Sequence, residues 1–298
     1  MKTTNIYALA IAIMALTVSC KKDDENDKLD YTSEAVVAKD QNQADAQVED
    51  VAFIQDNVMA ENDSKLGRIA ANGDTLMASY ETCGTVYIIP KGSNATGTIW
   101  VDFGTGCVGA DGRTRRGIVR WTFTDRLRTP GAVITTQFIN YAVKPAGESD
   151  FIGIDNASSK VTTNESSAEI SATNSVMNLK RVINMKLNFA DNTNFTWTGT
   201  KTLVWDLGQL GNKWDNVYTL KSGSGLSGVG RQGAAYTLTV NTDVIRKTAC
   251  QLIGVFKPVS GQITIQHNNR TKTIDYGNGS CDNTVSVTIN GLLRSFRW

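Results

Sequence analysis

The side chains best suited to chemistry are five cysteines, one histidine and two aspartates in a repeated motif. The motif reads T-I-W-V-D-F-G-T-G-C at residues 98–107 and K-T-I-D-Y-G-N-G-S-C at residues 272–281. Each copy runs an apolar strand into Asp-aromatic-Gly-x-Gly and then a cysteine. Matched cysteines can form disulfides, and the aspartates can close a turn or act as functional carboxylates.

The residue types in the motif favour a structural turn. Asp102 and Asp275 can accept hydrogen bonds from the backbone N–H groups two residues further on. The glycines can take φ values that a Cβ would forbid, and they are Gly104 and Gly106 in the first copy and Gly277 and Gly279 in the second. A functional carboxylate in each copy is the alternative interpretation.

The amino terminus has the composition of a targeting segment. Lys2 precedes an apolar run at residues 6–18, which is too short to span a bilayer, and Ser19-Cys20 follows. This arrangement resembles bacterial lipoprotein precursors, which implies a signal peptide at residues 1–19 and lipidation of Cys20. The K-K-D-D-E that follows resembles the surface-export signal of Bacteroidetes lipoproteins, which implies a lipid anchor in the outer membrane and display on the cell surface.

The other four cysteines form an even set: Cys83, Cys107, Cys250 and Cys281. In an oxidising compartment this set indicates two disulfides, and three pairings are open. The duplication favours Cys83–Cys107 and Cys250–Cys281, one in each copy of the motif. A metal site is not predicted, because no C-x-x-C spacing occurs and His267 is the only histidine. No cofactor is expected.

Charge is divided along the chain. Residues 21–63 hold 13 Asp/Glu and 4 Lys, a net charge of −9, whereas residues 64–298 hold 16 Asp/Glu and 25 Lys/Arg, a net charge of +9. Either the basic part meets an anionic glycan or lipopolysaccharide, or the acidic arm lies against its own domain. Nucleic acid is not an expected partner outside the cytoplasm.

The densest basic stretch lies at residues 113–128. The alternation of Arg116, Arg120, Arg126 and Arg128 predicts that they lie on one solvated face of a strand. The alternative interpretation is that these arginines form an anion-binding stripe.

Two kinds of element must position these residues. Residues 20–30 are expected to form an acidic tether. In residues 31–77, apolar residues recur at spacings of three and four positions, and this pattern predicts an amphipathic helix followed by a linker. The predicted stripe comprises Ala44, Val48, Val51, Ala52, Val58 and Met59. We expect it to dock on the domain that follows, with a coiled-coil contact as the alternative.

Residues 78–298 predict an all-β domain, because short β-branched and aromatic runs alternate with turn residues. No βαβ rhythm occurs, so the expected fold is an antiparallel sandwich or open barrel-like sheet, either as one domain or as two sub-domains. Alternation places Arg181 and Lys201 on the apolar sides of their strands. Residues 144–176 predict a loop or weak hairpin.

Catalysis is not indicated by the remaining motifs. The G-x-G-x-x-G at residues 223–228 is followed by strand-like residues, so it predicts a hairpin. His267 is expected in an exposed turn, and no G-x-S-x-G elbow accompanies it. Calcium at aspartates beside the glycine turns is an open alternative, and the tryptophans are expected in the core rather than in an exposed row for sugar stacking.

Taken whole, residues 78–298 resemble a family of β-rich Bacteroidetes lipoproteins. The resemblance rests on the D-F-G-x-G-C-x-G-x-D-G block from Asp102, on W-D-N-V-Y at 214–218, and on D-Y-G-x-G-x-C-D-N at 275–283. It implies a fold and a location but no activity. The predicted function is a non-catalytic envelope lipoprotein with a binding or structural role. Its expected partners are outer-membrane lipid and a glycan or envelope proteins; a glycan-binding module of a nutrient-uptake system is the alternative, and a hydrolase comes third.

Overall fold

The computed structural model describes most of the chain from residue 76 onward, together with eight helical residues between 47 and 59. The described ranges are 76–79, 83–91, 96–109, 111–210, 212–253, 255, 257–267, 269–282 and 284–297. Within them the fold is all-β and antiparallel, as the sequence predicts. The sheet is open and barrel-like, and it does not close on itself.

Seventeen strands form this one sheet in the described part of the chain. The amino-terminal wing contains β1 (Leu76–Ser79), β2 (Thr85–Lys91), β3 (Thr96–Asp102), β4 (Cys107–Val108), β5 (Thr114–Phe123), β6 (Val133–Lys144), β7 (Ile152–Ile154) and β8 (Ser159–Asn164). The centre contains β9 (Val176–Asn188) and β10 (Asn194–Asp206). The carboxyl-terminal wing contains β11 (Val217–Leu220), β12 (Gly225–Val229), β13 (Ala235–Lys247), β14 (Ser260–His267), β15 (Arg270–Asn278), β16 (Thr284–Ile289) and β17 (Leu292–Arg297).

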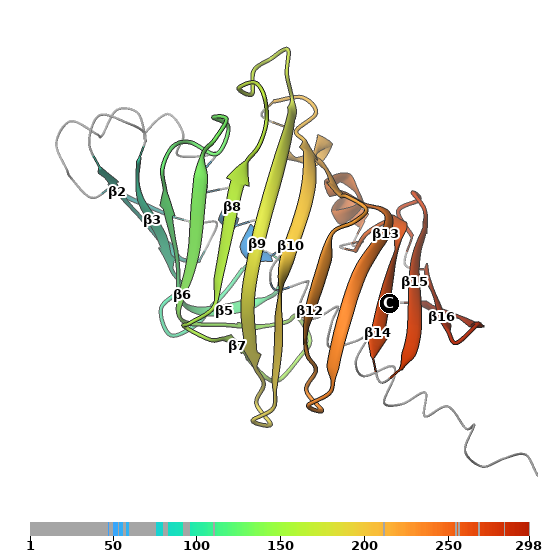
Figure 1. Cartoon of the computed structure of the whole chain (residues 1–298). Coiled ribbons are helices and arrows are strands. Elements are labelled where there is room, and N and C mark those ends of the chain that lie inside the picture. The colour runs from blue at the N-terminus through green and yellow to red at the C-terminus, as the bar shows by residue number, and fades with distance from the viewer. Residues whose placement is uncertain are drawn as a thin grey trace, which may run out of the picture.

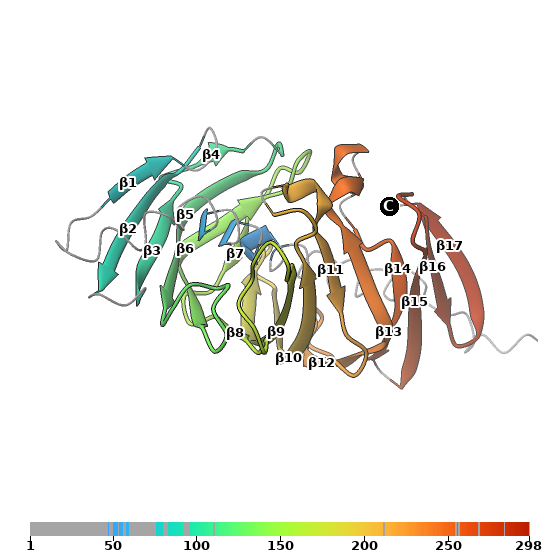
Figure 2. The same cartoon turned by 90° about the horizontal axis from the view of Figure 1, so that it is seen from above.

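The strands follow one another as a meander. The long strands pair in the order β1, β2, β3, β5, β6, β8, β9, β10, β12, β13, β14, β15, β16 and β17. The short strands β4, β7 and β11 lie beside longer neighbours. Figure 1 shows the sheet from the side, and Figure 2 shows it from above as an arc.

One register row of inward side chains crosses nearly the whole sheet. From β2 to β16 it comprises Ile88, Ile99, Trp121, Thr136, Lys160, Ile183, Gly199, Leu226, Leu238, Ile265, Lys272 and Ile289. All except Gly199 are buried. We call the face that carries this row the concave face. Because side chains alternate along a strand, the residues between them face outward, and many of these are threonines.

The described helical residues lie on the inner side of the arc (Figure 2). Val51, Ala52, Val58 and Met59 are buried, so the predicted docking of the helix on the β domain is confirmed for these residues. Ala44 and Val48 of the predicted stripe lie outside the described residues. The same buried side also carries polar side chains that the sequence reasoning did not single out, namely Gln47, Asp50 and Gln55.

The structure differs from the prediction of a loop or weak hairpin at residues 144–176, because β7 and β8 lie there and pair with β6 and β9 instead of with each other. Strand β8 pairs with both β6 and β9. Its buried positions are Lys160, Thr162 and Asn164, which are all polar. The strand therefore lacks the apolar alternation by which strands are predicted from sequence.

The predicted hairpin at the G-x-G-x-x-G sequence is present as β12 and the turn before it. β12 lies between β10 and β13, and a Cβ at Gly228 would lie 1.8 Å from the carbonyl oxygen of Thr196 on β10. Only glycine permits this close approach of the two backbones.

Candidate functional site

The two motif copies form the same kind of turn. The carboxylate Oδ1 of Asp102 accepts a hydrogen bond of 2.8 Å from the N–H of Gly104, and Oδ1 of Asp275 accepts one of 2.9 Å from the N–H of Gly277. The aromatic residue that follows is buried in both copies, as Phe103 and as Tyr276. Gly106 and Gly279 also have positive φ angles. The aspartates thus have the predicted turn role.

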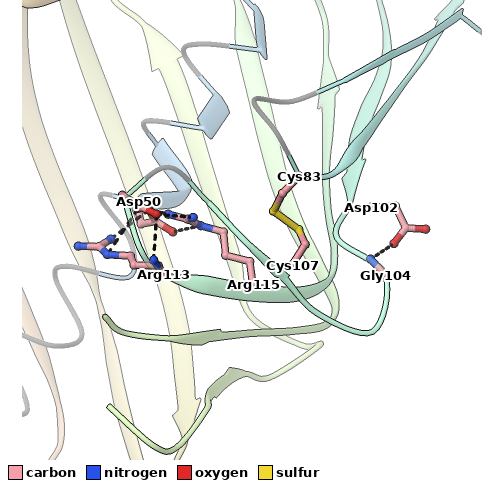
Figure 3. The surroundings of a disulfide bond; sticks show 8 residues. Asp50, Cys83, Asp102, Gly104, Cys107, Arg113 and Arg115 are labelled. Carbon is pink, nitrogen blue, oxygen red and sulfur yellow. Dashed lines mark hydrogen bonds and ion pairs between the residues drawn. A yellow bond between two sulfur atoms is a disulfide. The ribbon is translucent and has the colours of Figure 1, made fainter. Parts of the chain in front are cut away.

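Each turn is tied to the start of its own hairpin by a disulfide. Cys83, just before β2, is bonded to Cys107 after β3, with a Cα–Cα distance of 5.5 Å (Figure 3). Cys250 lies in the 3-10 helix η4 (Thr248–Ile253) and is bonded to Cys281 after β15, with a Cα–Cα distance of 5.2 Å. These are the pairings that the duplication predicts.

The corners lie in opposite wings of the sheet, so they do not combine into one site. Asp102 ends β3 and Asp275 lies in β15, with at least eight strands between them in the pairing order. The calcium alternative gains no support, because among the residues described no group of three or more His, Cys, Asp or Glu is placed to hold a metal ion.

The most connected polar cluster instead joins the helix to β5 (Figure 3). Asp50 receives Nε of Arg115 at 3.0 Å and Nη2 at 2.5 Å, and Nη1 of Arg113 at 3.0 Å. The hydroxyl of Tyr141 lies 3.5 Å from the same carboxylate. The Asp50 and Arg115 side chains are 4% and 3% exposed, so this ion pair is shielded from water.

Asp111 completes the cluster from the turn before β5. Its carboxylate oxygens accept hydrogen bonds of 3.0 and 2.5 Å from Arg115. Burial acts to raise the pKa of Asp111, but the hydrogen bond and charge of Arg115 outweigh it and hold the pKa below its ordinary value. Burial likewise acts to lower the pKa of Arg115, and the charge of Asp50 outweighs it, so this pKa is raised. Both shifts favour the charged forms of Asp111 and Arg115.

Further buried cations occupy the concave face of the sheet. Lys160 on β8, Arg181 on β9 and Lys201 on β10 are each less than 5% exposed. Arg181 lies directly opposite Lys201 in the pairing of β9 with β10, and opposite Thr162 in the pairing of β8 with β9. The predicted inward orientation of Arg181 and Lys201 is confirmed. We call Lys160, Thr162, Arg181 and Lys201 the central cationic patch.

Lys272 is a separate buried cation, on β15 in the carboxyl-terminal wing. It is fully buried, and its direct cross-strand neighbours are Ile265 and Ile289. Burial lowers the pKa of Lys272 to about 8. Removal from water is therefore the cause of this lowered pKa.

The prediction for His267 is wrong. The residue ends β14 and is 5% exposed, although the two-residue turn that follows it is short and polar. Burial, followed by the charge of Arg270, lowers the pKa of His267. His267 pairs with Tyr236 in the register of β13 and β14, so its ring lies on the concave face. The polar composition of the turn did not reveal this inward position.

The basic stretch of residues 113–128 is divided between different environments. Arg116 and Arg120 are exposed on β5, which fits the predicted solvated face, but Arg115 on the same strand is buried. Arg126 and Arg128 lie in the loop before β6, so they do not extend that strand face as predicted.

No protein-family model, curated protein or solved structure matches this chain. The site must therefore be interpreted from its own geometry. In the described part of the chain, no helix has both the length and the hydropathy to cross a membrane.

The tryptophans mainly fill the core. Trp121, Trp197 and Trp205 are buried, whereas Trp100 and Trp214 are half-buried. The ring of Trp100 stacks on Tyr87 at a centroid distance of 5.2 Å, and Trp298 lies outside the described residues. An exposed row of tryptophans is not formed by the five that the structure describes.

Proposed function

We propose that the protein is a non-catalytic, lipid-anchored envelope lipoprotein that is displayed on the cell surface and has a binding or structural role. One observation carries the proposal. The chain has five cysteines, and the two disulfides use four of them, so Cys20 is the one left over. It follows the apolar signal-like run directly, where a lipidated cysteine belongs.

The disulfides also support the proposed compartment. Such bonds form and persist in oxidising environments such as the bacterial envelope. Each lies at a corner of the sheet where it holds a backbone turn, which is a structural task. The K-K-D-D-E sequence after Cys20 supports an outward orientation at the outer membrane.

A binding role is supported by the distribution of buried charge. Asp102 and Asp275 are engaged in turns at distant corners, which argues against paired carboxylates and hence against the hydrolase interpretation. The glycan-binding alternative retains only the half-buried Tyr87–Trp100 stack, because the other described tryptophans do not form a row. Envelope proteins and anionic envelope components are the partner classes that suit the concave cations.

Lipidation can be tested by expressing the full precursor and a Cys20→Ala variant in a bacterial host with lipoprotein processing. We expect the mature protein to partition into detergent and its amino-terminal peptide to carry acyl mass. The Cys20→Ala variant should remain in the aqueous phase. A matched Ser19→Ala variant, which keeps the cysteine, should behave as the parent. An unmodified Cys20 in the mature protein would refute the anchor.

Surface display needs its own experiment. Protease added to intact cells should degrade the protein, whereas a periplasmic marker should survive until lysis. If the protein were protected from the protease as well as the marker is, it would lie on the periplasmic side of the outer membrane, and surface display would be contradicted.

A further inference from the structure

A row of outward-facing side chains crosses the amino-terminal wing and reaches the central strands. In register order from β2 to β9 it comprises Tyr87, Trp100, Arg120, Gln137, Ser159 and Asn184. We call these six residues the outer track. The helix lies on the other side of the sheet, in the interior of the arc (Figure 2). Because neighbouring strands lie about 4.8 Å apart, a ligand chain that runs across the strands meets a new side chain of the track at each strand.

Two aromatic rings form one end of the outer track. Tyr87 and Trp100 are half-buried, and their rings stack with a centroid distance of 5.2 Å and an interplanar angle of 18°. Tyr87 and Arg120 flank Trp100 on opposite sides in the register, so the face of the indole ring that Tyr87 does not cover is turned toward Arg120. An aromatic face carries partial negative charge, which attracts the weakly positive C–H groups on one face of a sugar ring. This end of the track therefore suits a sugar.

The rest of the outer track carries polar groups that the described part of the chain does not engage. Three of these side chains are exposed and one is half-buried: Arg120, Gln137 and Asn184, and Ser159. None of the four forms a side-chain hydrogen bond or an ion pair with a described residue. Lys180, which also faces outward on β9 but lies outside the track, is by contrast paired with Glu165 at 4.0 Å. The four polar side chains of the track are thus available to a ligand.

Arg120 determines which charge the ligand should carry. A guanidinium group donates two parallel hydrogen bonds to a carboxylate, and this geometry selects carboxylates over neutral groups. Asp102, the next outward residue after Trp100 on β3, does not supply that carboxylate, because it accepts the N–H of Gly104 at 2.8 Å. A ligand with a carboxylate one strand away from its stacked sugar would match both neighbours.

The distribution of apolar groups favours a glycan over a protein as the ligand. Protein interfaces are built around large apolar side chains at the centre of the contact, with polar groups at the rim. In the outer track the rings lie at one end, and the other four strands each contribute one hydrogen-bonding side chain. Such a narrow polar row suits a thin chain that is rich in hydroxyl groups.

We propose that the outer track binds an acidic polysaccharide, a chain of sugars with carboxylate groups that lies across the strands. One sugar stacks on Trp100, and the carboxylate of a neighbouring sugar binds Arg120. Hydroxyl groups further along the chain bond to Gln137, Ser159 and Asn184. The inference rests on the binding role within the proposed function and adds the partner class and the site. It does not depend on whether Cys20 carries lipid.

Calorimetry with polygalacturonate and alginate oligosaccharides tests the proposal on the mature chain, residues 20–298, in a neutral detergent. The matched ligand is the methyl ester of the bound oligosaccharide, which keeps the sugar backbone and loses the charge. We expect the parent to bind one of the acid forms, and Arg120→Met to raise its Kd at least about tenfold. The ester should bind the parent more weakly, and Arg120→Met should leave that binding unchanged. The matched variant is Lys180→Met, which removes an exposed outward charge outside the track and should bind like the parent.

Two further variants examine the ends of the outer track. Trp100→Ala should weaken the binding of acid and ester alike, because stacking does not depend on the carboxylate. Gln137→Ala/Asn184→Ala covers the case in which the tryptophan variant does not fold, since both of its side chains are exposed. We expect this double variant to raise the Kd several-fold with no loss of stability.

Three results would overturn the proposal. The first is a parent protein that binds neither acidic oligosaccharide. The second is an equal loss of binding in Arg120→Met and Lys180→Met, which would show attraction by overall positive charge. The third is equal affinity for acid and ester, because the occupant would then be a neutral glycan. A parent that carries acyl mass on Cys20 but binds neither oligosaccharide would refute this site and leave the lipid anchor standing, so the two proposals fail separately.

Discussion

At the scale of single residues, Lys272 shows how burial couples this fold to pH. Burial lowers its pKa to about 8, from the ordinary lysine value of 10.5. Between these two values the unfolded chain binds more protons than the folded protein, so the stability of the parent rises with pH in this window. Below pH 8 the lysine is charged in both states, and its full penalty on folding applies.

Replacing this lysine by an apolar residue of similar length should therefore stabilise the protein. We expect Lys272→Met to raise the free energy of unfolding by about 1–2 kcal/mol at pH 7, after allowance for solvent screening. The gain should vanish above about pH 10.5, where the lysine is neutral in both states. Denaturant unfolding at pH 7 and pH 10.5 measures both values.

The matched control for this prediction is Lys180→Met, since the Lys180 side chain is 47% exposed. It should change stability little at either pH. A Lys272→Met variant that is less stable than the parent at pH 7 would show that the favourable interactions of the lysine outweigh the cost of its burial.

At the scale of elements, the helix and β5 are joined by one charge cluster. Burial of the apolar residues stabilises the docked helix but does not by itself fix its orientation. Asp50 fixes the position of the helix through its ion pairs with Arg113 and Arg115. Removing one partner of a buried pair leaves the other charge uncompensated, which costs more than the pair contributes. Asp50 should therefore be the most sensitive position of the helix.

We expect Asp50→Asn to lower the free energy of unfolding by about 3 kcal/mol. Asp111→Asn removes a bond to the same arginine, but the Asp111 side chain is 29% exposed. We expect this control to cost about 1 kcal/mol or less. The contribution of Asp111 should also fade as pH falls through its lowered pKa, because its charge is then lost. Denaturant unfolding of both variants compares them, and an equal loss would contradict the role assigned to Asp50.

The elements that could be predicted from the sequence are those in which apolar residues recur with the period of a strand or a helix. Strands β9 and β10 alternate clearly, so even the inward positions of Arg181 and Lys201 could be predicted. Strand β8 could not be found in this way, because its inward residues are polar. The Asp50–Arg115 pair joins residues 65 positions apart, and one sequence gives no sign of that contact.

At the scale of the whole molecule, the sheet is continuous from β1 to β17. The two wings are joined by β9 and β10, which pair over their full lengths from Asn194 opposite Asn188 to Asp206 opposite Val176. Of the two domain arrangements that the sequence left open, a single cooperative unit suits this architecture better. Destabilising one wing should then also destabilise the other, because β9 and β10 couple their unfolding.

The disulfides provide a test of that cooperativity, because each lies in one wing. Their cysteines are 24 and 31 residues apart in sequence. Loops of this length predict a loss of about 3–4 kcal/mol when either bond is removed. We expect the Cys250→Ala/Cys281→Ala variant to lower the protection of slowly exchanging amides in β2 and β3 as well as in β14 and β15. The reciprocal variant, Cys83→Ala/Cys107→Ala, should do the same in the other direction. Loss confined to the altered wing in both variants would show that the sheet unfolds in two independent halves, and the central pair would then be only a physical link between them.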